Sequence, residues 1–159
     1  MGYTIIDILD KAILIQNKQV EIFQIIAHEN NNITVIKLLS KILIEKACKI
    51  RDYYNDLKNN ISKRNDIEEL DIMIYDKISF LINEFNTRIY IPSITCAKEY
   101  LLFTRDLTKD IYSLFIDIQG RLVNNFCSNS QFTYNILSKI ISCLDEHIED
   151  FDNTIEVLK

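Results

Sequence analysis

The chain has very few of the residues that build tight turns. Among its 159 residues there are 2 glycines and 1 proline. A β-sandwich or a nucleotide-binding α/β fold needs many more turns than these residues can make, so the sequence disfavours both classes. A glycine-rich phosphate-binding loop is excluded as well, because Gly2 and Gly120 each stand alone.

Histidine and cysteine, the usual ligands of zinc, are also few. The sequence has 2 histidines, and its 4 cysteines, Cys48, Cys96, Cys127 and Cys143, show no Cys-x-x-Cys spacing. A zinc site built from these cysteines is therefore not expected. We expect all four thiols to be reduced and to pack as small apolar groups in the interior.

Charge and hydropathy limit the partners that the protein can have. The net charge of -5 argues against nucleic acid as the main partner. The opening MGYTIIDILDK is acidic and has no cleavable apolar segment, so we expect no signal peptide. No apolar run approaches the roughly 20 residues that a membrane span requires. The sequence thus predicts a cytoplasmic protein that binds neither nucleic acid nor membranes.

Length and composition favour a single folded domain over residues 1–159. Hydrophobic residues make up 48% of the chain and charged residues 26%, which is enough apolar surface to form a core. Two domains of half this length would each be too small to bury a comfortable core.

The hydrophobic pattern predicts an all-α fold. Apolar residues recur in steps of three and four, and the strict alternation of a strand is nowhere sustained. Breakers at 30–32, 59–65, 91–93 and 127–130 divide the chain into five segments. We expect helices at about 3–29 and 33–60, from about 66, after 92, and from about 130. Thr4 with Asp7, and Asp66 with Glu69, have the spacing of a helix-capping box.

The short joints predict that successive helices run antiparallel. If the third helix packs outside the other four, it becomes the crossover between two antiparallel hairpins of a four-helix bundle. An up-and-down bundle of five helices fits the same periodicity.

Polar residues interrupt four of the predicted apolar seams near mid-length. They are Gln16 on the first helix, Lys46 and Lys49 on the second, Thr108 on the fourth, and His147 beside Leu144 on the fifth. Burying polar groups is unfavourable unless they are hydrogen-bonded, so a polar layer at mid-height indicates a site or its remnant. The alternative is that the lysines extend to solvent and Gln16 faces a groove.

Four segments carry a resemblance to a known family. They are 12–27 (AILIQNKQVEIFQIIA), 43–57 (LIEKACKIRDYYNDL, with Tyr53 and Tyr54), 97–115, and 140–151 (IISCLDEHIEDF). With this spacing the chain resembles the rubrerythrin-type branch of the ferritin-like superfamily. Members carry a Glu on the first and third bundle helices and a Glu-x-x-His on the second and fourth, which together hold two irons. The resemblance implies a ferritin-like antiparallel four-helix bundle whose additional helix is the crossover between hairpins.

Residue by residue, the resemblance implies a degenerate di-iron site. The family's ligand positions fall on Gln16, Lys46, Lys49, Thr108, Leu144 and His147, of which only His147 keeps the family's residue. Iron in this setting needs several anionic oxygen ligands and two imidazoles, and the lysines would repel a dication. We therefore expect no metal, no cofactor and no catalytic residue.

The remaining candidates are assigned structural roles. Five carboxylates near the seams are expected to be solvated: Glu21, Glu29, Glu45, Glu99 and Glu146. Glu45 with Cys48 has ligand spacing, but lies about 100° around the helix from the seam. His28 is expected to cap the first helix. Gly120 is expected to permit close approach of a neighbouring helix, with a π-bulge as the alternative.

Three functional hypotheses follow. The leading one is a non-catalytic bundle that acts as a cytoplasmic interaction or structural protein. The alternatives are a metal-dependent oxidoreductase or iron-handling protein with a rearranged site near His147, and a helical small-ligand binder that uses the polar layer. The third helix also predicts a homodimer, because Ile72, Met73, Tyr75 and Phe80 lie off its seam of Ile74, Ile78 and Leu81.

Overall fold

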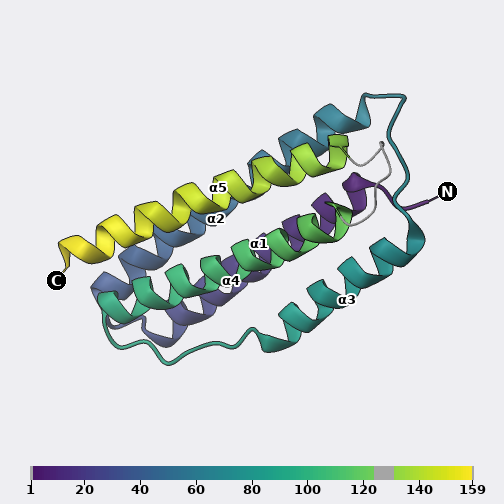
Figure 1. Cartoon of the computed structure of the whole chain (residues 1–159). Helices are drawn as coiled ribbons and strands as arrows, with labels where there is room; N and C mark the ends of the chain where they lie inside the picture. The colour runs from purple at the N-terminus through teal and green to yellow at the C-terminus, as the bar shows by residue number, and fades with distance from the viewer. Residues whose placement is uncertain (1, 124–130, 159) are drawn as a thin grey trace.

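The computed structural model describes residues 2–123 and 131–158, and its regular structure in these ranges is entirely α-helical (Figure 1). The helices are α1 (Ile5–Glu29), α2 (Thr34–Ser62), α3 (Ile72–Arg88), α4 (Ala97–Val123) and α5 (Gln131–Val157). The prediction of an all-α chain is confirmed. No helix of these ranges is long and apolar enough to span a bilayer.

The start of α1 is fixed by the predicted capping box. The Thr4 backbone N–H donates to Asp7 Oδ2 at 2.7 Å, and the Thr4 hydroxyl oxygen accepts from the Ile6 backbone N–H at 3.1 Å. At the other end, Asn30 Nδ2 donates to the Ile26 carbonyl at 2.9 Å. The prediction that His28 caps α1 is therefore wrong: Asn30 does so, and His28 is exposed in the last turn.

The third helix begins later than the sequence pattern predicts. Asp66, expected to lie at its start, instead pairs with Arg64 at 3.1 Å. Asp71 is the N-cap of α3, and its carboxylate accepts from the Met73 N–H at 2.8 Å and the Ile74 N–H at 3.4 Å. An Asp side chain satisfies the otherwise unpaired N–H groups of a first turn, so the better-placed Asp71 sets the boundary.

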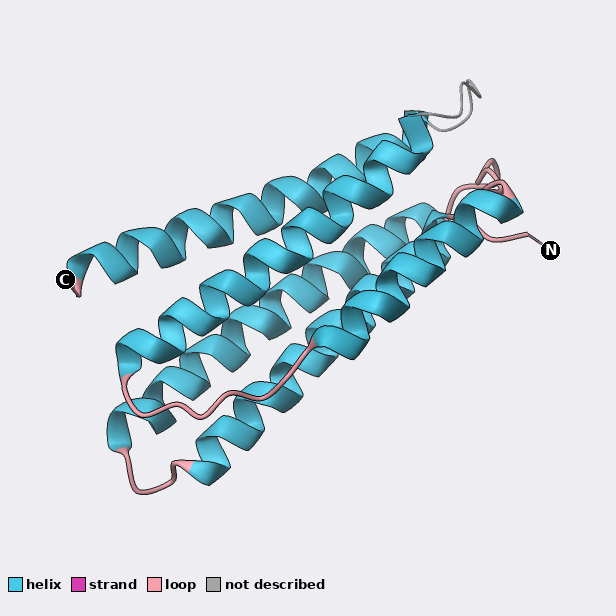
Figure 2. Ribbon diagram, turned by 60° about the horizontal axis from the view of Figure 1, so that its bottom comes forward, coloured by secondary structure: helices cyan, strands magenta, loops and turns pink. Residues whose placement is uncertain are grey.

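The helices pair as two antiparallel hairpins, α1 with α2 and α4 with α5 (Figure 1). The axes of all five helices run along nearly the same direction, as the turned view in Figure 2 also shows. The third helix lies alongside α4 and runs in the opposite direction. Its start is tied to the N-terminal segment, because the Tyr3 and Tyr75 rings stack with centroids 3.7 Å apart and the Leu70 N–H donates to the Tyr3 carbonyl at 2.7 Å.

The inner face of α3 differs from the predicted seam. Tyr75, Ile78 and Ile82 are buried, whereas Ile74 and Leu81 are only half-buried. The prediction that Tyr75 faces outward is wrong, since it is 8% exposed. Apolar residues occur on several sides of this short helix, so periodicity alone does not select the face that packs on the bundle.

Two expectations about small residues also fail. Cys96 is exposed and Cys48 and Cys143 are half-buried, so the thiols are not uniformly interior; Cys127 lies outside the described residues. Gly120 is exposed, and a Cβ built there would meet no atom within 4 Å. Gly120 therefore does not mediate close helix packing.

Candidate functional site

Five of the six predicted site residues come together around one small cavity. Gln16 from α1, Lys46 from α2, Thr108 from α4, and Leu144 and His147 from α5 all line it. The cavity has a volume of about 20 Å³. Helices from both hairpins thus contribute to a central layer, as the seam positions predicted.

Lys49 is the exception. Its side chain is 73% exposed, and its ammonium pairs with Glu45 on the same helix at 3.3 Å. Ala47 and Ile50 line the cavity in its place. The seam predicted for α2 ran through Lys46, but the buried residue at this level is Ala47, and this shift by one residue turns Lys49 outward.

Gln16 is the most deeply buried polar residue of the layer. It is 1% exposed, and its Oε1 atom is buried without a hydrogen-bond partner. A buried acceptor left unpaired costs about 1–3 kcal/mol. Gln16 is a polar residue in the middle of α1, where the neighbouring core positions Ala12 and Phe23 are apolar.

His147 is half-buried, and its Nδ1 atom is buried without a hydrogen-bond partner. Burial lowers the pKa of His147 from its usual 6.5, and the charge of Lys46 lowers it further; the carboxylates of Asp150 and Glu146 act in the opposite direction. The imidazole is therefore mainly neutral at pH 7. A neutral imidazole can accept one hydrogen bond and donate one.

Lys46 lies at the edge of the layer. Its side chain is 34% exposed, its Nζ atom is 3.9 Å from Asp150 Oδ2, and the same atom is 5.4 Å from the centre of the Phe151 ring. The ammonium thus reaches past an aromatic ring toward an exposed carboxylate of α5. This geometry supports the alternative in which the lysine stem is buried and the charge extends to solvent.

The hydroxyl groups of Thr104 and Thr108 donate their hydrogen bonds to backbone carbonyls of α4 itself. The Thr108 hydroxyl donates to the Thr104 carbonyl at 2.8 Å, and the Thr104 hydroxyl donates to the Tyr100 carbonyl at 2.9 Å. Their oxygens remain available as acceptors. One turn closer to the start of α4, Tyr100 and Ser40 share a buried hydrogen bond of 2.8 Å, and burial raises the pKa of Tyr100 to about 12.

Gln19 also lines the cavity and was missed from the sequence. The pattern predicted Val20 at that level of α1, whereas Gln19 is buried and Val20 is half-buried. The four-residue step from Gln16 to Val20 and the three-residue step from Gln16 to Gln19 are both helical, so spacing alone cannot decide between them.

The donor set around the cavity does not match a di-iron centre. It contains amides, hydroxyls, one imidazole and one ammonium, and no carboxylate. Over residues 2–123 and 131–158, no three His, Cys, Asp or Glu side chains gather as a metal site would require. A volume of about 20 Å³ accommodates a single water molecule, and pockets for organic ligands are typically about 300–1,000 Å³.

The other candidate carboxylates are exposed, as predicted. This holds for Glu21, Glu29, Glu45, Glu99 and Glu146. Glu99 is fixed at the start of α4, where it accepts from the Thr95 hydroxyl at 2.8 Å and the Thr95 N–H at 3.0 Å. These hydrogen bonds lower the pKa of Glu99.

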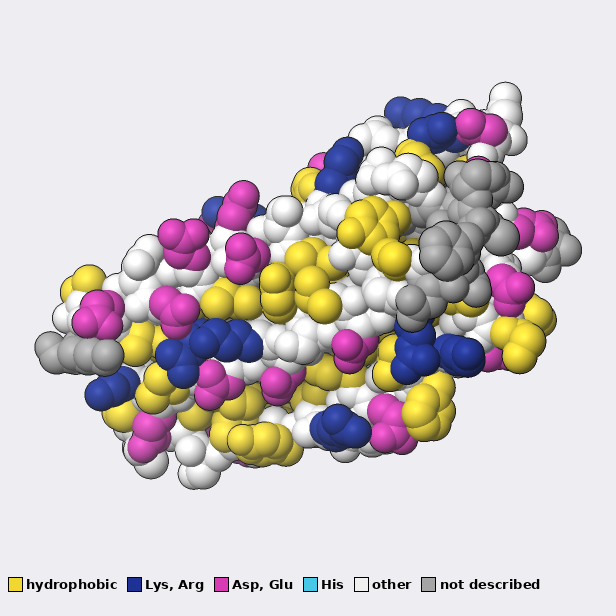
Figure 3. All heavy atoms as spheres, in the orientation of Figure 1, with side chains coloured by type: hydrophobic (Ala, Val, Ile, Leu, Met, Phe, Trp, Pro, Cys, Tyr) yellow, Lys and Arg dark blue, Asp and Glu magenta, His cyan; other side chains and the backbone are white. Residues whose placement is uncertain are grey.

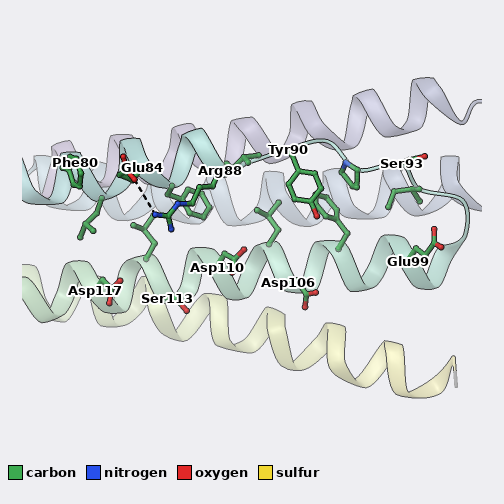
Figure 4. A pocket seen from close by; sticks show the side chains of 18 residues that line it. Phe80, Glu84, Arg88, Tyr90, Ser93, Glu99, Asp106, Asp110, Ser113 and Asp117 are labelled. Carbon is green, nitrogen blue, oxygen red and sulfur yellow. Dashed lines mark hydrogen bonds and ion pairs between the residues drawn. The ribbon is translucent and has the colours of Figure 1, made fainter.

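A much larger hollow lies on the surface between α3 and α4 (Figures 3 and 4). It has a volume of about 640 Å³, and the chain between the two helices contributes to its wall. Its charged lining residues are Glu84, Arg88, Glu99, Asp106, Asp110 and Asp117. The acidic residues of α4 follow spacings of seven, four and seven, which place them along one side of a helix. This pattern was readable from the sequence and was missed.

A scan against models of protein families, a search of curated proteins and a search of solved structures found no match to this chain.

Proposed function

We propose that this chain is a ferritin-like bundle that has lost its di-iron site and acts through its surface as a non-catalytic interaction protein. The observation that carries the proposal is the composition of the central layer. Five of the six positions matching family ligands meet around one cavity, where Gln16, Lys46, Thr108 and Leu144 stand in place of carboxylates and only His147 keeps the family's residue. The sixth position, Lys49, stands in place of the second imidazole and lies outside the cavity. Iron would lack the anionic oxygens that neutralise it.

The arrangement of the helices supports the ferritin-like part of the proposal. Two antiparallel hairpins, α1–α2 and α4–α5, are connected through α3, which runs back along the length of α4. In our proposal α3 is the crossover helix of a ferritin-like four-helix bundle.

The alternative is a metal-dependent oxidoreductase or iron-handling protein with a rearranged site near His147. One observation favours it: the Nδ1 atom of His147 is buried at the cavity without a hydrogen-bond partner. Its Lys46 neighbour argues against it, because an ammonium beside the imidazole raises the cost of placing a cation there. The small-ligand hypothesis is not retained for the central layer, because its cavity is too small.

Cytoplasmic location and self-association belong to the same proposal. The thiols of Cys48, Cys96 and Cys143 are free, as is usual in a reducing compartment. The dimer is assigned to the exposed apolar face at the start of α3, where Ile72 is 64% and Met73 is 68% exposed.

Thermal unfolding with and without metal tests the proposal. A ligand that binds only the folded state raises the melting temperature, by more as its concentration rises above its Kd. We expect iron(II) or manganese(II) to leave the melting temperature of the full chain unchanged. A rise that disappears in His147→Ala would overturn the proposal in favour of the alternative, and Lys49→Ala serves as the control because that residue lies outside the cavity.

A further inference from the structure

We propose that the groove between α3 and α4 docks a basic amphipathic helix of a partner protein. This inference rests on the proposed interaction function and names the partner class. Three properties of the groove support it: an apolar floor, an excess of negative charge on its walls, and its length.

The floor of the groove is apolar and is built from both helices. Leu81 and Phe85 come from α3, and Phe103, Leu107 and Leu114 come from α4. In the space-filling view, apolar side chains are visible between charged ones on this face of the molecule (Figure 3). An amphipathic helix binds such a floor through anchors at positions i, i+3 or i+4, and i+7.

The walls carry negative charge that is only partly compensated. Five carboxylates line the groove against one cation, Arg88, which lies 3.5 Å from Glu84 across a single helical turn (Figure 4). Of the carboxylates on α4, Glu99 is held by Thr95 and Asp106 pairs with Arg105 at 3.0 Å.

Asp110 and Asp117 are the carboxylates on α4 that have no cation beside them in the described part of the chain. Neither forms an ion pair within 4 Å in the described part of the chain. Burial and the charge of Asp106 raise the pKa of Asp110, as expected for a carboxylate with no cation beside it. Lysine or arginine side chains on the flanks of a docked helix would supply the missing positive charge.

The length of the groove selects a helix over a compact ligand. Its carboxylates extend along α4 from Glu99 to Asp117, which is about 27 Å at 1.5 Å per residue. A helix of about 18 residues spans that distance, whereas a drug-sized molecule cannot contact both ends. The apolar floor between the ends favours an amphipathic partner over a purely polar polycation.

The test is fluorescence anisotropy with the full chain and a labelled 18-residue peptide. The peptide carries leucines at helical i, i+3 or i+4, and i+7 positions and lysines on both flanks. We expect saturable binding that weakens as salt is raised. The double variant Asp110→Asn with Asp117→Asn should weaken binding about tenfold. The matched control, Asp145→Asn with Glu149→Gln, makes the same charge change on exposed sites of α5 outside the groove and should leave binding unchanged.

A second variant tests the apolar contribution to binding separately from the contribution of the charged walls. Tyr90 is 67% exposed and its ring contacts Phe103 in the groove, so Tyr90→Ala removes part of the apolar wall without disturbing the core. We expect this variant to weaken binding of the peptide severalfold at high salt as well as at low salt.

Three results would overturn the docking proposal. The first is that a peptide with glutamates in place of the lysines binds as tightly as the basic peptide. The second is that a peptide of the same charge with scrambled leucines binds as tightly. The third is that spermine binds while the basic peptide does not. Each result would show that the groove does not bind a basic amphipathic helix selectively. None of them involves iron, so failure here is distinguishable from failure of the proposed function, which iron binding at the central layer would show.

Discussion

Gln16 and His147 face the same cavity from α1 and α5, and each has a buried polar atom without a hydrogen-bond partner. In our proposal the two residues stand at positions of lost or retained ligands of a ferritin-like di-iron site. We expect the layer that they share to cost stability, because a buried polar atom without a partner loses the hydrogen bonds that water gives it in the unfolded chain.

Replacing Gln16 by Met should stabilise the protein. Met has nearly the same volume and shape, and it removes the unpaired Oε1 atom from the interior. We expect the free energy of unfolding in urea to rise by about 1 kcal/mol. The exposed Gln24→Met on the same helix is the control and should change it little. A loss of more than about 1 kcal/mol in Gln16→Met would show that the amide is fully hydrogen-bonded.

The stability of the protein should depend on pH through His147. Its pKa in the folded state is below the usual 6.5, so the unfolded chain takes up the proton first as pH falls. The free energy of unfolding therefore decreases as pH drops through 6.5 toward the folded-state pKa and levels off below it. Urea unfolding at about pH 7.5 and about pH 5.5 should show a smaller decrease in His147→Gln than in the native chain.

The control for that experiment is His28→Gln, which alters an exposed histidine at the end of α1. Its decrease in stability between the two pH values should match that of the native chain. Equal pH dependence in His147→Gln and the native chain would contradict the assigned environment of the imidazole.

Replacing Gly120 by Ala should also stabilise the protein. Gly120 lies inside α4, is exposed, and has open space where a Cβ would be added. Alanine loses less backbone entropy on helix formation, so we expect a gain of about 0.5–1 kcal/mol in the free energy of unfolding. Ser142→Ala, at an exposed site of α5, is a control with a smaller expected gain. Destabilisation by Gly120→Ala would restore the view that a neighbouring group approaches this glycine.

The exposed apolar start of α3 should mediate self-association. We expect sedimentation velocity at micromolar concentration to show a dimer for the native chain and a monomer for Ile72→Lys with Met73→Lys. Leu14→Lys, which charges an equally exposed apolar residue on α1, should remain dimeric. A native chain that sediments only as a monomer would refute the assignment.

The helical architecture was predictable because the pattern of each long helix is redundant. In α4, the predicted seam residues Leu101, Thr104, Thr108, Ile111 and Phe115 are all buried. Many apolar residues at helical spacing fix both the helix and its inward face. For the same reason, the sequence pattern was enough to predict that Gln16, Lys46, Thr108, Leu144 and His147 lie at one level of the bundle.

The sequence pattern determined less clearly which face of α2 points to the core, and the prediction for Lys49 was wrong for this reason. Leu39, Lys46 and Tyr53 were expected on the seam, whereas Ser40 and Ala47 are buried at the levels of the first two. Small residues pack well between helices but carry little hydrophobic signal, so a pattern of large apolar residues passes over them.

The groove was not predicted because it depends on tertiary packing. The acidic stripe of α4 is visible in the sequence, but a stripe of charge on a helix is usually a solvated face. Only the position of α3 beside α4 places Asp110 and Asp117 along the wall of an apolar hollow.

Iron content of the reconstituted protein tests the central claim most directly. The full chain is incubated anaerobically with iron(II), exposed to oxygen, desalted and submitted to elemental analysis, with His147→Ala treated in parallel. Because the cavity offers no carboxylate ligand, we predict iron far below one atom per chain and the same value in both proteins. Stoichiometric iron in the native chain that is lost in His147→Ala would contradict the account.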